Sequence, residues 1–226
     1  MSNINRIKTR KPLPPEYEKI FKEAYKANRE GRGIAAFLSQ RMESWMHRQV
    51  AKSKFQSNTV LELGAGTLNH IKYELSCSPI YDVVEPFKEL YKDSQYLCEV
   101  RHIYSDISEI TGGGYDRIFS IATYEHVLDL DNLLAQSRKL LKENGLHIIA
   151  IPNEGHLLWK LGWMCTTGLS FRLKYGLDYG VIISHEHVNA AAEIEALITK
   201  YYSIKKCKVF GITKKLCLYR VYYCVK

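Results

Sequence analysis

The segment 60–67 constrains the fold of this chain most, because an apolar strand in it runs directly into a turn of the form Gly-x-Gly. Gly64 and Gly66 permit backbone conformations and close approaches that a Cβ atom resists. A strand, a glycine turn and a following helix form the first unit of a parallel α/β sheet, where ligands bind at the helix start. The alternative is that an ordinary strand-to-helix turn needs glycine here for steric reasons, without any ligand.

Short apolar runs bounded by glycine or acidic residues recur after residue 59, which is the pattern of alternating strands and helices. They predict strands at 59–63, 81–84, 100–104, 116–122 and 146–151. A helix is expected near 189–201, and two further strands, 203–210 and 216–225, are expected to pair through Gly211. The chain should therefore form an α/β fold with a Rossmann-like, seven-stranded, mostly parallel sheet. Helices should cover both faces, and the C-terminal strand should be antiparallel.

The residues before this sheet predict an N-terminal helical extension. A basic leader, interpreted as a solvated tail, precedes a helix over 16–30 and a second helix over 34–52. Residues 1–52 are thus expected to hold the leader and these helices, and residues 53–226 the α/β domain. The segment 153–188 is too long for a plain connection, and its aromatic residues favour an ordered lid inserted after the fifth strand.

Composition limits which classes of binding partner and which cellular compartment we expect for this chain. A net charge of +8 favours phosphates, nucleic acid or a lipid surface, and 46 % hydrophobic residues exclude wholesale disorder. No apolar stretch approaches the roughly 20 residues that cross a bilayer, and no secretory segment is evident. We therefore expect a cytoplasmic protein without a transmembrane helix. The six cysteines form no Cys-x-x-Cys pair, which indicates reduced thiols and argues against a zinc knuckle.

Acidic residues lie at or just after the ends of the first three strands. Glu62 precedes the glycines, Glu85 ends the second strand and Asp106 follows the third. These ends meet at one edge of a parallel sheet, where a carboxylate about 20 residues after the glycines binds a ribose diol. A nucleoside-containing cofactor is therefore expected, with helix capping as the alternative role for each acid. Asn69 stands where dinucleotide-binding turns carry a third glycine, which disfavours nicotinamide.

As an ordered set, several segments of this sequence resemble the class I S-adenosylmethionine-dependent methyltransferases, in particular those acting on small molecules and glycans. The resemblance spans residues 45–226. It rests on Leu-Glu-Leu-Gly-Ala-Gly at 61–66, Val-Val-Glu-Pro at 83–86, Ser-Asp-Ile at 105–107, Tyr-Asp-Arg-Ile-Phe-Ser at 115–120, Tyr-Glu-His-Val at 124–127 and Leu-Leu-Lys-Glu-Asn-Gly-Leu at 140–146.

The resemblance implies S-adenosylmethionine as cofactor, S-adenosylhomocysteine as product, and a set of contacts. Glu62 would bind the methionine amino group, Glu85 the ribose hydroxyls and Asp106 the adenine amino group. Ile107 would donate its backbone N–H to adenine. The full set of cofactor-binding residues that it implies is Glu62, Gly64, Ala65, Gly66, Glu85, Pro86, Asp106, Ile107, Ala122 and Thr123.

Methyl transfer from a sulfonium to an alcohol requires an aligned acceptor and removal of a proton, and histidine suits the second task. His126 follows the fourth strand, and His185 and His187 follow the aromatic insertion. We expect a catalytic base among these three, with packing or capping as the alternative for each. A metal site formed by them with Glu125 is conceivable, but no spacing requires one, so no metal is expected.

Two features indicate the class of methyl acceptor: the residue types in the lid, and the lack of a turn motif that is typical of nucleobase methylation. Nucleobase amino methylation usually accompanies an Asn/Asp-Pro-Pro-aromatic turn, whereas residues 122–125 read Ala-Thr-Tyr-Glu, so RNA is disfavoured. Aromatic faces suit sugar rings and cations suit phosphates. Glu125, Trp159, Arg172 and Tyr175 are therefore predicted to contact the substrate, and O-methylation of a sugar or surface-glycan precursor is the favoured activity.

Other functions stay open at this point. Methylation of another small metabolite, including at nitrogen, needs no base, and RNA methylation is a further alternative. A scaffold that binds the cofactor without transferring a methyl group would keep the same acidic residues. Membrane contact is expected to be peripheral at most, through the apolar run 156–167. The oligomeric state does not follow from these patterns.

Overall fold

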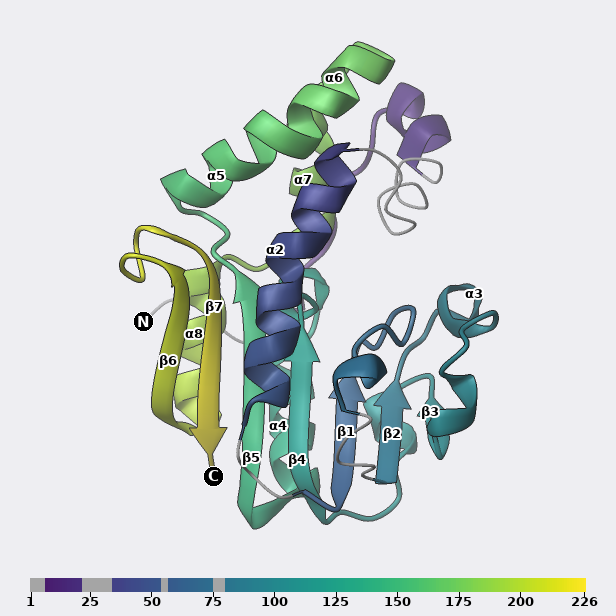
Figure 1. Ribbon diagram of the computed structural model, residues 1–226, viewed down its shortest axis with the longest axis vertical. Helices are drawn as coiled ribbons and strands as arrows, with labels where there is room; N and C mark the ends of the chain where they lie inside the picture. The colour runs from purple at the N-terminus through teal and green to yellow at the C-terminus, as the bar shows by residue number, and fades with distance from the viewer. Residues whose placement is uncertain (1–6, 22–33, 54–56, 75–79) are drawn as a thin grey trace.

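The computed structural model describes residues 7–21, 34–53, 57–74 and 80–226 (Figure 1). Its sheet has seven strands in the order β3-β2-β1-β4-β5-β7-β6. The strands are β1 (Thr59–Leu63), β2 (Ile80–Val84), β3 (His102–Tyr104), β4 (Tyr115–Ile121), β5 (Leu141–Pro152), β6 (Ser203–Gly211) and β7 (Cys217–Val225). The expected Rossmann-like α/β fold is confirmed.

The directions of the strands show at which edge of the sheet a ligand is expected to bind. β1 to β5 pair in parallel, and β7 runs antiparallel to both β5 and β6, as expected. The strand order reverses at β1, which pairs with β2 on one side and β4 on the other. Ligands of doubly wound sheets bind beside the carboxyl ends of strands at such a reversal.

Helices cover both faces of the sheet (Figure 1). One face carries α2 (Ile34–Ala51), whose Met46 and Val50 pack against side chains such as Val60 and Phe119. The opposite face carries α4 (Leu130–Leu140) and α8 (Ala191–Tyr201), packed against Leu61 and Leu63 among others. Successive strand residues point to opposite faces, and both faces are buried, so the strands read as apolar runs.

The remaining helices are short. Between the strands lie η1 (Ile71–Tyr73), α3 (Lys88–Tyr91), η2 (Leu97–Glu99), η3 (Ile107–Glu109) and η4 (Tyr124–His126). After β5 come α5 (Leu157–Trp163), η5 (Met164–Gly168), α6 (Leu169–Tyr175) and α7 (Tyr179–Glu186). These last four form the lid, which lies beyond the carboxyl ends of the parallel strands (Figure 1). No helix in the described ranges is both long and apolar enough to span a bilayer.

Two local expectations differ from the structure. β5 begins at Leu141 rather than residue 146, because Leu141 pairs with Tyr115 across a register shift. The leader is not a solvated tail over residues 7–21. Lys8 Nζ donates to Val188 O at 2.8 Å, and Tyr17, on a short helix at 15–21, packs against the lid. The expected helix portion at 22–30 lies outside the described residues.

His147 makes the fold sensitive to acid. It is fully buried on β5, with Nε2 2.8 Å from the Tyr124 hydroxyl, and burial lowers its pKa from 6.5 to about 3. The unfolded chain binds this proton below about pH 6.5, whereas the folded chain does so only near its lowered pKa. Stability is therefore lost as the pH falls between these values.

We expect His147 alone to remove about 2 kcal/mol from the free energy of unfolding between about pH 7.5 and about pH 5. Urea unfolding of the wild type and of His147→Gln at both pH values measures this. The variant should lose less stability on acidification than the wild type. An equal loss in both proteins would show that His147 does not cause the acid sensitivity.

Candidate active site

A cavity of about 310 Å³ lies at the carboxyl edge of the sheet, beneath the lid. This volume falls within the range of roughly 300–1,000 Å³ that is usual for small-molecule sites. Segments far apart in the sequence meet here: α2, the turns after β1 and β4, the lid and β7. The sequence-predicted residues that line it are Glu62, Gly64, Ala65, Gly66, Ala122, Glu125, His126, Trp159 and His187.

The turn after β1 requires glycine at residue 64 for two reasons, its backbone angle and the lack of room for a side chain. Gly64 has φ +74°, and a Cβ atom there would lie 2.3 Å from Cγ2 of Thr123. The turns after β1 and β4 thus touch at a point that admits no side chain. Leu68 also has a positive φ of 62°, so it adopts the left-handed conformation although it is not glycine, and its side chain is fully buried.

The strand-end acids differ in their surroundings. Glu62 is buried and faces the cavity, Tyr81 donates to its Oε2 at 2.7 Å, and burial raises its pKa to about 8. Glu85 accepts from Gly66 N at 2.7 Å, which joins the end of β2 to the glycine turn. Asp106 accepts from Ser108 N at 2.9 Å and so caps η3.

Several predicted site residues lie outside the lining of this cavity. His185 turns toward the leader, where its Nδ1 lies 2.5 Å from Lys11 O. Arg172 is exposed on α6, and Tyr175 packs on Phe171 with ring centroids 4.8 Å apart. The complete set outside the lining is Glu85, Pro86, Asp106, Ile107, Thr123, Arg172, Tyr175 and His185.

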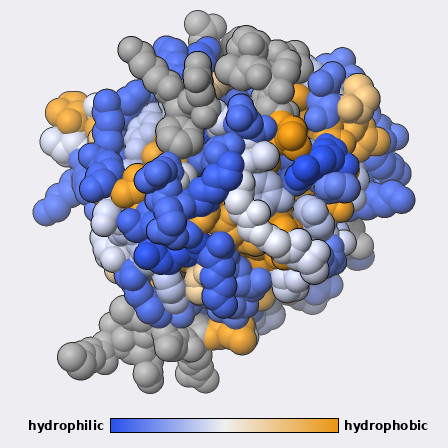
Figure 2. Space-filling view, turned by 90° about the horizontal axis from the view of Figure 1, so that it is seen from below, coloured by the Kyte–Doolittle hydropathy of each residue, from blue (hydrophilic) through white to orange (hydrophobic). Residues whose placement is uncertain are grey.

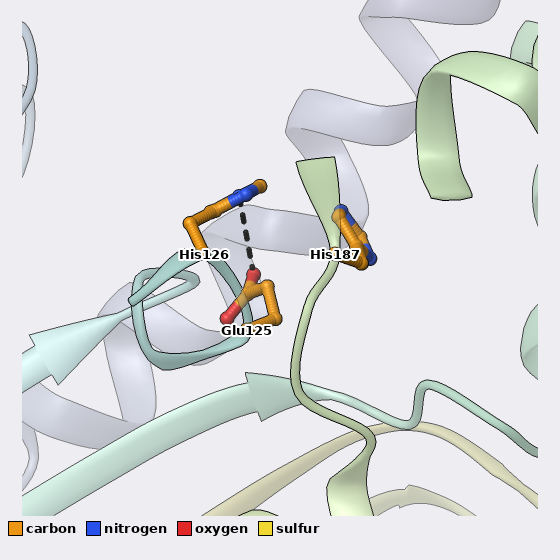
Figure 3. A group of neighbouring side chains, drawn as sticks. All are labelled: Glu125, His126 and His187. Atoms are coloured by element: carbon orange, nitrogen blue, oxygen red, sulfur yellow. Dashed lines mark ion pairs between the residues drawn. The ribbon is translucent and has the colours of Figure 1, made fainter. Parts of the chain in front are cut away.

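Glu125, His126 and His187 come together at the cavity wall (Figure 3). One possible metal-ligating atom from each lies within 4.8 Å of the others, and the two imidazole rings meet edge to face at a centroid distance of 4.8 Å. His126 Nε2 lies 3.8 Å from Glu125 Oε1. The turn after β4 supplies two of these residues and the end of the lid supplies the third.

Hydrogen bonds fix the protonation of Nδ1 in both histidines. His126 Nδ1 donates to the backbone carbonyl of Glu186 at 3.1 Å, and His187 Nδ1 donates to Glu154 Oε2 at 2.8 Å. A carbonyl or carboxylate oxygen only accepts, so the hydrogen belongs to Nδ1 in each case. In the neutral form of either ring, Nε2 therefore carries the lone pair.

Charges in the group are tuned by burial and by one another. Burial raises the pKa of Glu125 to about 7. Burial acts to lower the pKa of His187, but the hydrogen bond to Glu154 and the neighbouring carboxyls raise it overall. Burial also acts to raise the pKa of Glu154, yet the hydrogen bond from His187 holds it below its usual range. Opposed shifts of this kind in a cavity wall are typical of functional sites.

Sequence reasoning missed two residues that hold this group in place. Glu154, just after β5, accepts from Trp159 Nε1 at 2.5 Å as well as from His187. Asn189 donates through Nδ2 to Tyr124 O at 2.8 Å and to Val127 O at 2.7 Å, which ties the turn after β4 to the end of the lid. The position of Glu154 at a strand end was the available signal, whereas Asn189 gave none.

The fold and this cavity define a class of protein: Rossmann-like enzymes that bind a nucleoside-containing cofactor at the carboxyl edge of the sheet. The model of a family described as "Methyltransferase domain" matches residues 34–190. The chain belongs to this family, and it is a class I S-adenosylmethionine-dependent methyltransferase. S-adenosylmethionine is its cofactor.

Solved structures share this fold at low identity. A protein from Pyrococcus horikoshii OT3 is 13 % identical over 91 % of this chain and 97 % of its own, with a TM-score of 0.64. An S-adenosylmethionine-dependent methyltransferase from Archaeoglobus fulgidus is 13 % identical over 93 % and 100 %, with a TM-score of 0.62. An O-methyltransferase family protein from Burkholderia thailandensis is 13 % identical over 96 % and 64 %, with a TM-score of 0.60. Comparison with curated proteins gives no match.

Proposed function

We propose that this enzyme methylates a hydroxyl group of a sugar or surface-glycan precursor. The observation that carries the proposal is the position of Glu125, His126 and His187 in the wall of the same cavity that the glycine turn lines. Groups able to activate a hydroxyl therefore face the place where the methyl donor belongs. Nitrogen acceptors with an unprotonated amine need no such group.

The donor is proposed to lie along the glycine turn. Gly64, Ala65 and Gly66 line the cavity and let the backbone approach the donor closely, and Gly64 also lets this turn lie against Thr123. Glu62 is a buried carboxyl group in the cavity wall, and the positively charged amino group of the methionine portion is proposed to hold it in its ionised form. Glu85 is held at the turn by Gly66 N and is proposed to exchange this contact for the ribose hydroxyls.

The bound cofactor supplies a methyl carbon made electrophilic by a positively charged sulfur. The acceptor oxygen forms the new bond to carbon as the carbon–sulfur bond breaks, and the bonding electron pair stays on sulfur. The hydroxyl proton must leave, and Nε2 of His126 and of His187 are the atoms that we propose activate the hydroxyl. Glu154 and Asn189 act as positioning residues, because they hold His187 and the turn after β4.

Aromatic side chains of the lid support a sugar as acceptor. Trp159, Trp163 and Tyr179 line the cavity, and aromatic faces pack well on sugar rings. Arg172 and Tyr175, outside the lining, keep a substrate role only for a part of the acceptor that reaches the outer surface of the lid.

The acceptor class is tested by transfer of a labelled methyl group from S-adenosylmethionine into extract of the source cells. The products are separated into RNA, protein, lipid or glycan, and small-molecule fractions. We expect label in the glycan or lipid-linked glycan fraction. Label in RNA that nuclease removes, or label only in a nitrogen-methylated metabolite, would replace the proposed acceptor. Cofactor binding with no label in any fraction would favour a scaffold.

A lipid-linked acceptor is favoured by the outer surface of the lid, which we propose contacts a membrane peripherally from the cytoplasm. Exposed lysine and arginine side chains, Lys160, Arg172 and Lys174, flank exposed apolar ones. The opposite end of the molecule, seen from below, is mainly hydrophilic (Figure 2). The exposed apolar side chains along α5, η5 and α6 are Leu157, Leu161, Met164, Leu169 and Leu173.

Vesicle sedimentation tests this contact. The wild type should bind phosphatidylcholine vesicles that contain phosphatidylglycerol more strongly than vesicles of phosphatidylcholine alone, because the lid is basic. The double variant Leu169→Ser, Leu173→Ser should bind at least ~10-fold more weakly, since each buried leucine contributes about 1.5–3 kcal/mol. Leu97→Ser, an exposed leucine on η2, is the control. Equal binding by all three proteins would exclude the lid as the contact.

A further inference from the structure

We propose that Glu125, His126 and His187 bind a divalent transition-metal cation, which activates the acceptor hydroxyl. This inference rests on the proposed function for its role in the reaction, but the binding site itself stands on geometry. Potential ligand atoms of the three residues lie within 4.8 Å of one another at the cavity wall (Figure 3). The sequence alone gave no spacing that required such a site.

The Glu125 carboxylate has one oxygen paired with His126 Nε2 at 3.8 Å and a second oxygen without a hydrogen bond in the described part of the chain. This second oxygen, Oε2, is buried. The backbone carbonyl of Glu125 accepts from Val188 N at 2.8 Å and Asn189 N at 3.1 Å, so the residue is held where it is. A buried acceptor left unsatisfied is costly, and a cation would satisfy it.

Both imidazoles are oriented as metal ligands usually are. A ligating histidine commonly donates its other ring N–H to a carboxylate or a backbone carbonyl, which fixes the tautomer. His187 does this with the carboxylate of Glu154, and His126 does it with the carbonyl of Glu186. Nε2 is therefore the atom of each ring that would ligate the cation.

The donor set determines the kind of cation. Two imidazole nitrogens and one carboxylate suit Zn²⁺, Fe²⁺, Co²⁺ or Mn²⁺, whereas Mg²⁺ and Ca²⁺ prefer sites made of oxygen. Three protein ligands leave coordination positions open to the acceptor. His185 takes no part, because its Nδ1 lies against Lys11 O.

The cation changes the role of the two histidines from proton acceptors to ligands. A hydroxyl bound to the cation is more acidic, because the positive charge stabilises the alkoxide. Its proton leaves to water, its oxygen bonds to the methyl carbon, and the carbon–sulfur bond breaks with the electron pair retained by sulfur. The sulfonium thereby becomes a neutral thioether, and the cation is unchanged.

Metal binding by the full-length protein tests the site without any acceptor. After treatment with a chelator, the protein is dialysed against Co²⁺ or Zn²⁺; bound metal is measured by mass spectrometry and the Co²⁺ coordination by visible absorption. We expect a single cation per chain in the wild type and in His102→Ala, whose histidine is exposed on β3. Binding should be lost in His126→Ala and His187→Ala.

Glu154→Gln provides a milder test that leaves all three ligands in place. It should weaken cation binding roughly 10- to 100-fold, because the oriented hydrogen bond to His187 is weakened. Binding of S-adenosylmethionine by each variant shows that it is folded. Wild-type affinity for the cation in folded His126→Ala and His187→Ala would overturn the site, as would absence of binding in the wild type.

The outcomes separate this inference from the proposed function. Methyl transfer to a hydroxyl that survives removal of all bound metal would overturn the cation and keep the proposed activity. Cation binding through these residues without hydroxyl methylation would keep the cation site and overturn the proposed activity. Loss of transfer on chelation, restored by Co²⁺ or Zn²⁺, is the expected result.

Discussion

Replacing Gly64 with alanine should weaken the binding of S-adenosylmethionine by at least roughly 100-fold. The new Cβ would lie 2.3 Å from Cγ2 and 2.5 Å from Oγ1 of Thr123, far inside contact distance, and the φ of +74° is itself unfavourable for alanine. The substitution therefore strains this loop by about 1–3 kcal/mol. It also displaces the turn that lines the cofactor cavity, which weakens binding. Isothermal titration of the purified variant with S-adenosylmethionine measures the loss.

Gly176→Ala is the matched control for this change. Gly176 has a nearly equal φ of +71°, but a Cβ atom there meets nothing within 4 Å, and the residue ends α6 outside the cavity lining. It should therefore bind S-adenosylmethionine as the wild type does. If both variants bind equally well, the close contact between Gly64 and Thr123 does not shape the cofactor site.

His187→Ala should lower kcat by roughly 10²- to 10⁴-fold while the Kd for S-adenosylmethionine stays the same. Hydroxyl activation contributes a factor of this size in many enzymes. His187 lies in the cavity wall with Glu125 and His126 and is not among the residues proposed to contact the donor, so its removal leaves those contacts in place. Single-turnover transfer from labelled S-adenosylmethionine, combined with equilibrium binding, separates the two quantities.

His185→Ala distinguishes this prediction from a general effect of losing a histidine near the lid. His185 precedes His187 by two residues, yet its ring packs against Phe21 and Lys11 O outside the cavity. Its loss should reduce kcat much less than that of His187. A larger effect from His185 than from His187 would mean that the lid closes differently during the reaction.

The strands were predictable because both faces of the sheet are buried, so β1 and β2 read as apolar runs followed by glycine or an acid. The glycine turn was predictable for a different reason. Gly64 adopts a left-handed backbone conformation, which glycine adopts more readily than other residues. The start of β5 was not predictable, because its pairing with Tyr115 depends on a register shift between two strands. Local propensity carries no information about such a shift.

The candidate site was only partly predictable. The pair Glu125 and His126 followed from its place after β4, but the choice between His185 and His187 depends on where α7 ends and how the chain then turns. Arg172 and Tyr175 were expected to contact substrate because of their residue types, and they lie on α6 outside the lining of this cavity. Side-chain direction within a lid is a tertiary property, so residue type alone cannot supply it.

Two segments distant in sequence from the glycine turn complete the cavity wall. α2 contributes Glu43, Met46 and His47, and β7 contributes Leu218 and Tyr219. Their positions follow from packing on the sheet next to β4 and β5, which brings them to the carboxyl edge.

The central claim is that this enzyme transfers a methyl group to a hydroxyl, and the chemical shift of the transferred carbon tests it most directly. S-adenosylmethionine carrying a ¹³C-methyl group is incubated with the purified enzyme and the glycan or lipid-linked glycan fraction of the source cells. The account predicts a product signal at the shift of an O-methyl ether on a sugar, absent with His187→Ala. A signal at the shift of an N-methyl group, undiminished in that variant, would contradict it.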